Sequence, residues 1–365
     1  MIALHMGSID DPTDIEKLMV DDGMANPYNM IIQHVVGLSI WMINDLGASN
    51  MKILFFGRGV ISTQYAWAFE QAGHTVEFYV RKGRKETFGS RIALEMWDAR
   101  KGKKLIKESW NVKLHEEILP HYDLIIVSVN TEQLPEAAQF LSTAAGNTPI
   151  LLFNNIWQDL KSSIAPLSMN NVVFGFPGAG GGIADNKLRG GFLKMVFLEK
   201  PRPGTELINN KVKELFESAH FKISWVKDMQ NWLWNHFAMN AAMEAEVLKR
   251  GSFPALMNHK DSFANVGKHM REMIPVLKAR GAKPDAISLL LTKIPPAILG
   301  ILFNKVIFAK GSLARLFVEY NNSKAGFAVL EVVREAKKAG IPLPRLTRAF
   351  GNTEYHKAIE NPILP

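Results

Sequence analysis

The chain has 365 residues, 47% of them hydrophobic and 21% charged, which is typical of a globular protein of about two domains. Because it contains no cysteine, disulfides, thiolate metal ligands and a cysteine nucleophile are excluded, and a reducing, cytoplasmic compartment is consistent with this. The net charge of +8 would suit nucleic acid, but no basic stripe interleaved with aromatic residues is present. An anionic cofactor and substrate explain the charge as well, so we expect no nucleic-acid partner and no metal.

Residues 1–50 carry seven acidic residues and one basic residue, a charge of −6 that leaves +14 for the rest of the chain. Their apolar stretch, 30–43, is too short to span a bilayer and lacks the basic start of a signal peptide. We therefore expect an acidic N-terminal extension over 1–50 and no membrane partner. The extension is either genuine or precedes a true start at Met51, and the sequence leaves both open.

Residues 52–80 read as a strand, a tight turn, a helix and a second strand, which is the first half of a dinucleotide-binding βαβ unit. Gly57 lets the backbone bend sharply, and Gly59 lets a pyrophosphate approach the main chain. The third glycine position holds Ser62, which is small enough for the helix to pack on the strand. An ordinary glycine turn is the alternative. We expect the turn and the helix start to bind the cofactor through Gly57, Arg58, Gly59, Val60 and Ile61.

The residue that ends the second strand distinguishes NAD from NADP. An NAD site usually has Asp or Glu there for the ribose 2′-hydroxyl, whereas this chain has Arg81 and then more basic residues. Because the forked donors of arginine match a 2′-phosphate, we predict NADP(H). The alternative is a solvated basic turn without a ligand, and we expect this for the three basic residues that follow Arg81, namely Lys82, Arg84 and Lys85.

Four further apolar runs predict buried strands, and polar residues follow two of them at the sheet edge where α/β proteins bind ligands. Asn130 follows the first of these strands, and Asn155 comes shortly after the second. A glycine-rich run, 177–183, follows the third, and we expect the fourth to be the last strand. The predicted strands are 124–129, 149–153, 172–176 and 195–198.

From about residue 204 the hydrophobic pattern becomes helical. The run 287–309 contains lysines and Pro295-Pro296, so we expect two helices with a break at the prolines, serving an oligomer contact or a substrate lid, and no membrane span. The strongest predicted helices are 229–249, 262–280, 313–322 and 324–339. We thus predict an α/β protein with three regions: the extension 1–50, a Rossmann-type NADP-binding domain 51–203, and an all-α substrate and dimerisation domain 204–365.

The chain resembles the ketopantoate reductase family, a group within the 6-phosphogluconate-dehydrogenase-like proteins, over about residues 51–350. The motifs that carry the resemblance are Gly57-x-Gly59, Ala72-Gly73-His74, Arg81, Phe153-Asn154-Asn155, the helix 233–240, Ser312 and 340–344. The resemblance implies a cytoplasmic, NADPH-dependent 2-dehydropantoate 2-reductase of pantothenate biosynthesis, with an α-keto acid as substrate and a D-2-hydroxy acid as product. A homodimer is also consistent with it.

Carried over by position, the family asparagine that holds substrate is Asn240, the residue near the nicotinamide is Asn155, and the family serine is Ser312. Two ionisable positions differ: the proton-donating lysine is replaced by His236, and the glutamate twelve residues after the serine is Lys324. Asn130 stands where a lysine-type residue follows the third strand. The resemblance therefore implies a divergent member with Asn155, Asn240 and Ser312 on the substrate and Asn130 and Asn155 on the cofactor.

The replaced residues still offer the chemistry that ketone reduction requires. His236 and Asn240 are four residues apart on one helix face, which Glu244 extends. A histidine kept protonated by a carboxylate could donate the proton, while Lys324 could bind the substrate carboxylate or itself be the acid. In the alternative, His236 is a packed helix residue and Lys324 is solvated.

Two other functions remain open. An opine-type dehydrogenase would use a related two-domain plan and require an amine in addition to the keto acid. A non-catalytic NADP-binding protein would explain why both family ionisable residues have been replaced.

Overall fold

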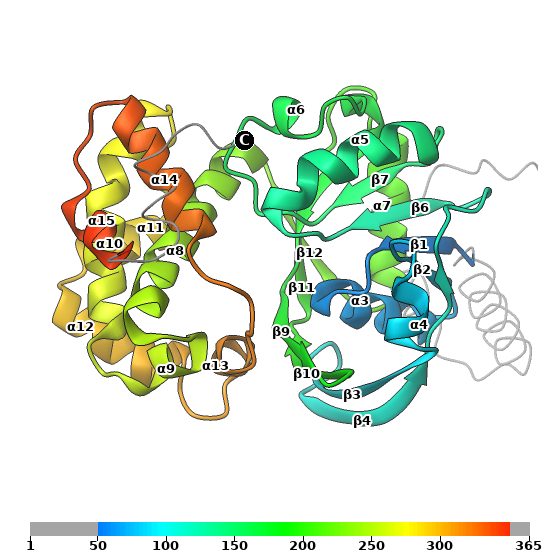
Figure 1. Cartoon of the computed structure of the whole chain (residues 1–365), viewed down its shortest axis with the longest axis horizontal. Helices are drawn as coiled ribbons and strands as arrows, with labels where there is room; N and C mark the ends of the chain where they lie inside the picture. The colour runs from blue at the N-terminus through cyan, green and yellow to red at the C-terminus, as the bar shows by residue number, and fades with distance from the viewer. Residues whose placement is uncertain (1–49, 351–365) are drawn as a thin grey trace, which may run out of the picture. The chain divides into compact units, whose positions relative to one another are not determined.

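The computed structural model describes residues 50–350, which comprise an α/β part and a helical part (Figure 1). The expected extension, up to residue 49, lies outside the described residues. The first βαβ unit forms as predicted, from β1 (Lys52–Phe56), α3 (Val60–Glu70) and β2 (Thr75–Tyr79). Side chains of β1 alternate between two hydrophobic layers: Ile53 and Phe55 join one, and Leu54 and Phe56 join the other. This alternation shows that the strand is covered on both faces.

The main sheet has eight strands in the order β12-β11-β8-β7-β6-β1-β2-β5, and all its pairs are parallel except β8 with β11. Strand β1 lies between β2 and β6, with Ile53 opposite both Val76 and Leu124. The carboxyl ends of β1, β6 and β7 therefore meet at one edge. The other strands of this sheet are β5 (Leu114–His115), β6 (Leu124–Val127), β7 (Ile150–Leu152), β8 (Val172–Phe176), β11 (Met195–Glu199) and β12 (Lys222–Val226).

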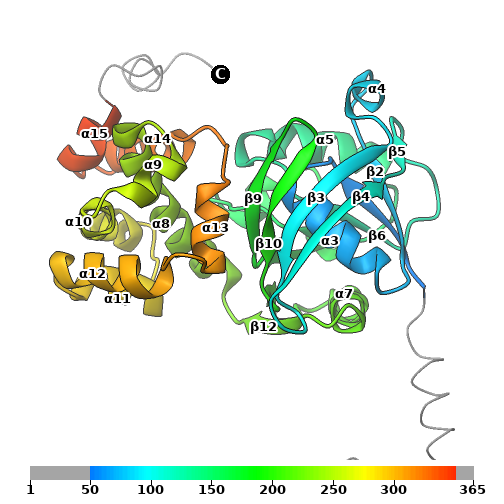
Figure 2. The same ribbon diagram turned by 90° about the horizontal axis from the view of Figure 1, so that it is seen from below.

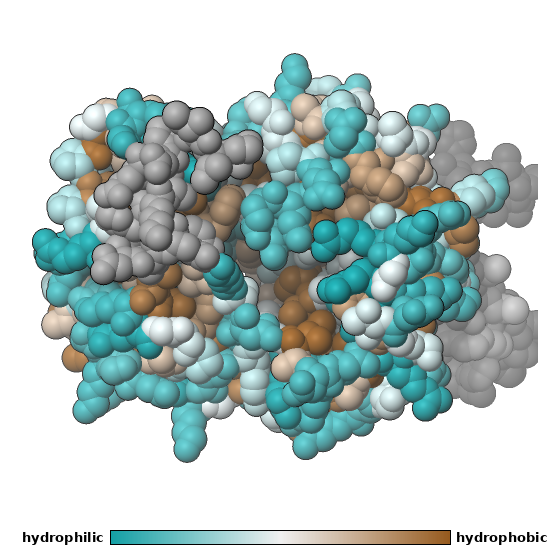
Figure 3. Space-filling view, viewed as in Figure 1, coloured by the Kyte–Doolittle hydropathy of each residue, from teal (hydrophilic) through white to brown (hydrophobic). Residues whose placement is uncertain are grey.

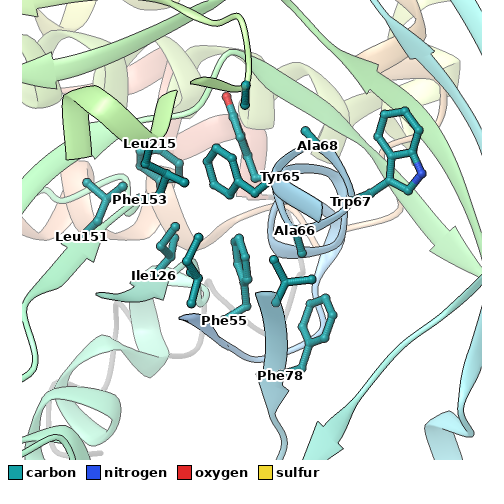
Figure 4. Close-up of a cluster of buried hydrophobic side chains, with 14 of the residues drawn as sticks. Phe55, Tyr65, Ala66, Trp67, Ala68, Phe78, Ile126, Leu151, Phe153 and Leu215 are labelled. Atoms are coloured by element: carbon teal, nitrogen blue, oxygen red, sulfur yellow. The ribbon is translucent and has the colours of Figure 1, made fainter. Parts of the chain in front are cut away.

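One layer of the α/β core surrounds helix α3. Tyr65 is fully buried there and lies 5.4 Å from Phe153 and 5.1 Å from Phe221 between ring centroids. Figure 4 shows Tyr65 on the side of α3 near Phe153 and Leu215, while Trp67 points away on the other side of the helix. The Tyr65 hydroxyl accepts a hydrogen bond from the backbone N–H of Gly178 at 3.1 Å, which ties α3 to the loop after β8.

A second sheet of four strands, in the order β4-β3-β10-β9, lies beside α3 (Figure 2). It contains the glycine-rich run that we expected to follow a strand, and most of that run forms β9. Strands β9 and β10, which we did not predict, lie in the chain between β8 and the predicted strand 195–198. The bounds are β3 (Arg91–Asp98), β4 (Lys104–Asn111), β9 (Ala179–Ala184) and β10 (Lys187–Phe192).

The main sheet continues beyond residue 203, where we expected the α/β domain to end. Helix α7 (Glu206–Ser218) leads into β12, which pairs with β11 over five residues. Our expectations that 195–198 is the last strand and that 204 starts an all-helical domain are therefore wrong. The remaining short elements of the α/β part are α4 (Arg84–Phe88), η1 (Thr131–Gln133), α5 (Leu134–Ala144), α6 (Leu160–Ser163) and η2 (Met169–Asn171).

The helical part begins with the long helix α8 (Met229–Arg250), and its predicted helices are confirmed. The two helices predicted on either side of the paired prolines also form, as α11 and α12. Pro295 is the N-cap of α12, and Pro296 is its first residue. Within residues 50–350, no helix is long and apolar enough to cross a membrane. The others are α9 (Phe253–Asn258), α10 (Ser262–Ala279), α11 (Ala286–Lys293), α12 (Pro296–Leu302), the π-helical turn η3 (Phe303–Ile307), α13 (Leu313–Glu319), α14 (Phe327–Lys338) and α15 (Pro344–Phe350).

Helix α13 lies directly against β9, as Figure 2 shows. A Cβ on Gly180 would stand 2.7 Å from the Cβ of Phe317, and one on Gly182 would overlap the carbonyl oxygen of Tyr320. The Asn322 side chain also donates to the carbonyl of Ile183 at 2.7 Å. Glycine is thus required in β9 for the two parts of the chain to approach.

Candidate functional site

The glycine turn lies where β1 ends. Gly57 has φ +95°, a conformation that side-chain-bearing residues rarely adopt, and its N–H donates to the carbonyl of Tyr79 at 2.9 Å. A Cβ on Gly59 would meet only the carbonyl oxygen of Ser128, at 3.9 Å. Gly59 is also the N-cap of α3, and no side chain caps this helix start. The N–H groups at the start of α3, including those of Val60 and Ile61, are thus positioned for an anion.

Arg58 is 7% exposed, and its guanidinium lies 4.4 Å from the ring centroid of Phe88. Its Nε and Nη1 are buried and have no hydrogen-bond partner in the described part of the chain. Burial lowers the pKa of Arg58, which means that the charged form is poorly solvated. Unpartnered nitrogen atoms of a buried cation beside an anion-binding turn fit a cofactor phosphate.

Arg81 is exposed and lies two residues beyond the end of β2, as predicted. The turn that follows it is ordered by Glu116, whose carboxylate accepts from the N–H of Gly83 at 2.8 Å and of Lys85 at 3.3 Å. Arg84, expected to be solvated, has its guanidinium 5.3 Å from the Phe88 ring centroid. Both Arg58 and Arg84 therefore flank Phe88 beyond the end of the second strand.

The loops after β6 and β7 are tied together at the same sheet edge. The Thr131 hydroxyl donates to the carbonyl of Asn155 at 2.7 Å, and the Asn154 side chain donates to the carbonyl of Val129 at 2.7 Å. Asn130 is joined to its own loop by its N–H, which donates to Gln133 at 3.2 Å. The Asn155 Oδ1 is buried and unpartnered within residues 50–350, so it is available to a ligand.

His236 lies between aromatic rings. Its ring stacks on Trp232 at 5.0 Å with an interplanar angle of 6°, and Phe176 of β8 lies 4.2 Å away. Burial lowers the pKa of His236 to about 4, and within residues 50–350 no carboxylate offsets this effect. The ring is therefore neutral near pH 7, which does not support the hypothesis of a histidine kept protonated by a carboxylate.

Glu244 lies two turns further along the same face of α8, and its pKa is shifted in the opposite direction to that of His236. Its carboxylate accepts from the N–H of Gly326 at 2.8 Å and of Ala328 at 2.9 Å, at the start of α14. Burial raises the pKa of Glu244 to about 7 against these hydrogen bonds, and the negative charge of Glu132 adds to the rise. Glu132, in η1 just after β6, is therefore near enough to Glu244 to affect its pKa.

Asn240 lies on α8, one turn after His236, and two other predicted residues, Ser312 and Lys324, lie elsewhere on the helical part. The Ser312 hydroxyl accepts from the N–H of Arg315 at 3.2 Å and donates to the carbonyl of Ile307 at 2.9 Å, so it caps α13. Lys324 lines a hollow of about 410 Å³ with Leu248 and Gly251, near the end of α8. This hollow begins at Val247, eleven residues along α8 from His236, which corresponds to about 16 Å.

The arrangement thus brings together the glycine turn, Arg58, Asn130 and Asn155 at one edge, with the α8 face opposite them. Figure 3 shows hydrophobic side chains gathered near the middle of this view, where β11 and the start of α3 lie in Figure 1. Two properties of this site were not predicted from the sequence: the raised pKa of Glu244 and the burial of Arg58. The spacing of eight residues from His236 to Glu244 was the available signal.

Residues 53–182 match the family model described as ketopantoate reductase PanE/ApbA. A search of curated proteins found no match to the sequence. Among solved structures, the chain is similar to a PanE/ApbA family ketopantoate reductase from Ralstonia eutropha JMP134, with 17% identity, a TM-score of 0.61, and 85% of this chain and 100% of that chain covered.

Two further structures share this fold. D-mandelate dehydrogenase, solved with NADH and anilino(oxo)acetate, has 16% identity and a TM-score of 0.61, with 85% of this chain and 98% of that chain covered. A dimeric ketopantoate reductase from Staphylococcus aureus has 15% identity and a TM-score of 0.56, with 85% and 100% covered. At these identities the similarity establishes the predicted fold, an α/β cofactor-type domain followed by helices.

Proposed function

We propose that the protein, whose residues 53–182 match the family model of ketopantoate reductase PanE/ApbA, is an NADPH-dependent oxidoreductase that reduces the ketone of an α-keto acid to a 2-hydroxy acid. The cofactor, when bound, supplies the hydride. The observation that carries the proposal is the buried Arg58 guanidinium with two unpartnered nitrogen atoms beside the glycine turn. A buried cation without a partner is costly, and a phosphate group of the cofactor satisfies it.

The cofactor end of the site is built from the turn and the two loops. The N–H groups of Val60 and Ile61, with the main chain of Gly57 and Gly59, bind the pyrophosphate. Arg58, after β1, and the exposed Arg81, after β2, would hold the 2′-phosphate. Asn130 and Asn155 hold the nicotinamide end, where the unpartnered Asn155 Oδ1 supports a ligand contact.

Reduction of the ketone requires a proton at its oxygen, and we assign this proton to Glu244 in preference to His236. A carboxyl group with a pKa of about 7 is partly protonated near neutral pH, whereas a histidine with a pKa of about 4 is not. The neutral His236 ring then forms an apolar wall between Trp232 and Phe176. Asn240, one turn before Glu244, orients the substrate by hydrogen bonding.

Lys324 and Ser312 retain supporting roles in the proposal. Lys324 supplies a positive charge for a substrate carboxylate, from the hollow near the end of α8. Ser312 already makes two hydrogen bonds, so it contacts substrate only through a remaining lone pair and otherwise fixes α13.

The test is a spectrophotometric assay of NADPH oxidation with ketopantoate and other branched 2-oxo acids, each with and without an added amine. Turnover with a keto acid alone supports the proposal. Turnover that requires the amine would instead indicate an opine-type dehydrogenase. Tight NADPH binding without turnover on any substrate would indicate a non-catalytic NADP-binding protein.

The pH dependence of kcat/KM identifies the acid. A donor with a pKa of about 7 must be protonated to act, so the rate falls as the pH rises through about 7. A donor with a pKa of about 4 would already have lost its proton at pH 6. If a Glu244→Gln variant keeps the wild-type rate and pH profile of kcat/KM, Glu244 is not the proton donor.

A further inference from the structure

A separate hollow of about 300 Å³ lies on the helical part, between α8, α10 and α15, which are neighbours in Figure 1. On α8 it is lined by Glu246 and Lys249. Because successive helix residues turn by about 100°, Glu246 points about 200° away from Glu244. The hollow is therefore on the opposite side of α8 from the proposed reductase site.

The hollow is lined by four cationic side chains from three helices: Lys249, Lys268, Arg345 and Arg348. Arg345 and Arg348 are three residues apart on α15, so their guanidinium groups lie on one face. Both are exposed, as is Lys249, while Lys268 is half-buried and bonded to Asn265 at 3.3 Å. Such a set offers several charge-assisted donors to one anion.

The carboxylates near these cations are already engaged. Glu246 lines the hollow, but it is 1% exposed and lies within 3.3 Å of His269 Nε2 and of Asn265 Nδ2, and 3.6 Å from Arg250 Nε. Glu272 of α10 accepts from the N–H groups of Arg345 and Leu346 at 2.8 and 2.9 Å. These hydrogen bonds leave Glu246 and Glu272 charged, but the four cations that line the hollow outnumber the two carboxylates, so its net charge is positive.

His269 adds a polar group to the wall. It is 7% exposed, and its Nδ1 is buried without a hydrogen-bond partner in the described residues. Since its Nε2 is bonded to Glu246, Nδ1 is the ring atom left for a ligand. With its Nε2–H donated to Glu246, the ring can accept a hydrogen bond at Nδ1 from a protonated phosphate oxygen.

We propose that this hollow binds a small phosphate-bearing molecule, held by Arg345 and Arg348 on one side and by Lys249 and Lys268 on the other. The volume is at the lower end of the range for small-molecule sites, which fits inorganic phosphate or a compact phosphate monoester. The site is independent of the reductase assignment, because no residue of the proposed cofactor or substrate site contributes to it.

The test is isothermal titration calorimetry of the full chain with inorganic phosphate and, separately, with glycerol 3-phosphate, at constant ionic strength. Each titration is repeated with saturating NADPH, so that binding at the glycine turn is blocked, and in an Arg58→Ala background in case NADPH does not bind. The proposal expects binding that survives both conditions. A stronger signal from glycerol 3-phosphate than from inorganic phosphate identifies a monoester as the ligand, and the reverse identifies the free anion.

Variants locate the site. The double variant Arg345→Gln/Arg348→Gln should weaken phosphate binding by about tenfold or more, and Lys249→Gln/Lys268→Gln should do so independently. The control Lys278→Gln/Lys337→Gln removes the same charge from exposed positions outside the hollow and should leave binding unchanged. Equal loss in the control, unchanged binding in both test variants, or no binding in the wild type would overturn the proposal.

Discussion

The carboxyl group of Glu244 makes the stability of the folded protein depend on pH. Its pKa is about 7 in the folded state and about 4.5 in an unfolded chain. A folded pKa above the unfolded one means that protonation stabilises the fold, so this stabilisation is complete below about pH 4.5 and lost as the pH rises through about 7. The pKa difference of about 2.5 corresponds to about 3 kcal/mol.

Glutamine keeps the shape of the protonated side chain and still accepts from the N–H of Gly326 or Ala328, but it does not titrate. The free energy of unfolding of Glu244→Gln, relative to wild type, should therefore increase by about 3 kcal/mol between pH 4 and pH 9. Urea unfolding at a series of pH values, followed by tryptophan fluorescence, measures this difference. The same substitution at Glu214, exposed on α7, is the control. A difference between Glu244→Gln and wild type that stays constant across the range would refute the reasoning.

Three further predictions concern the cofactor turn, the substrate helix and the joint between the parts. Arg58→Ala and Arg81→Ala should each weaken NADPH binding by about tenfold in a fluorescence titration while changing NADH binding little, and equal weakening of both cofactors would contradict the 2′-phosphate assignment. Asn240→Ala should raise KM for the keto acid without changing the Kd of NADPH; an altered NADPH Kd would place Asn240 outside the substrate site. Gly182→Ala should lower the Tm by several degrees, because a Cβ there overlaps the carbonyl oxygen of Tyr320. The control Gly300→Ala should not, because a Cβ there meets only ordinary contacts. Equal Tm values for the two variants would show that the close approach of α13 to β9 does not require glycine.

The elements that were predicted correctly are those whose signal is local. The helix α8 follows from an apolar periodicity and ends at Gly251, which has φ +92°. The first βαβ unit likewise follows from Gly57 and two buried strands. In contrast, β4 has an exposed, charged outer face and half of β9 is glycine, so neither has the composition of a strand. Their pairing partners, rather than their own residues, determine that they are strands.

In the candidate site, too, the local features could be predicted from the sequence and the non-local ones could not. The turn residues could be assigned from spacing, because Gly57 and Gly59 act through their own backbone. The charge states of His236 and Glu244 could not, because they depend on groups far away in the sequence. His236 is neutral because Phe176, sixty residues earlier, lies against it, and Glu244 is held by the start of α14, more than eighty residues later.

The close approach of α13 to β9 has a mechanical consequence for the site. Asn322, just after α13, is hydrogen-bonded to the carbonyl of Ile183 in the α/β part, and Gly326 is bonded to Glu244 in the helical part. The residues between them form a tether of a few peptide units with one end attached to each part. Any opening that admits a ligand while α13 stays docked must extend this tether and pull on the N–H groups that hold Glu244. In the mechanism proposed above, in which Glu244 donates the proton, this short piece of backbone would couple access to the substrate with the acidity of Glu244.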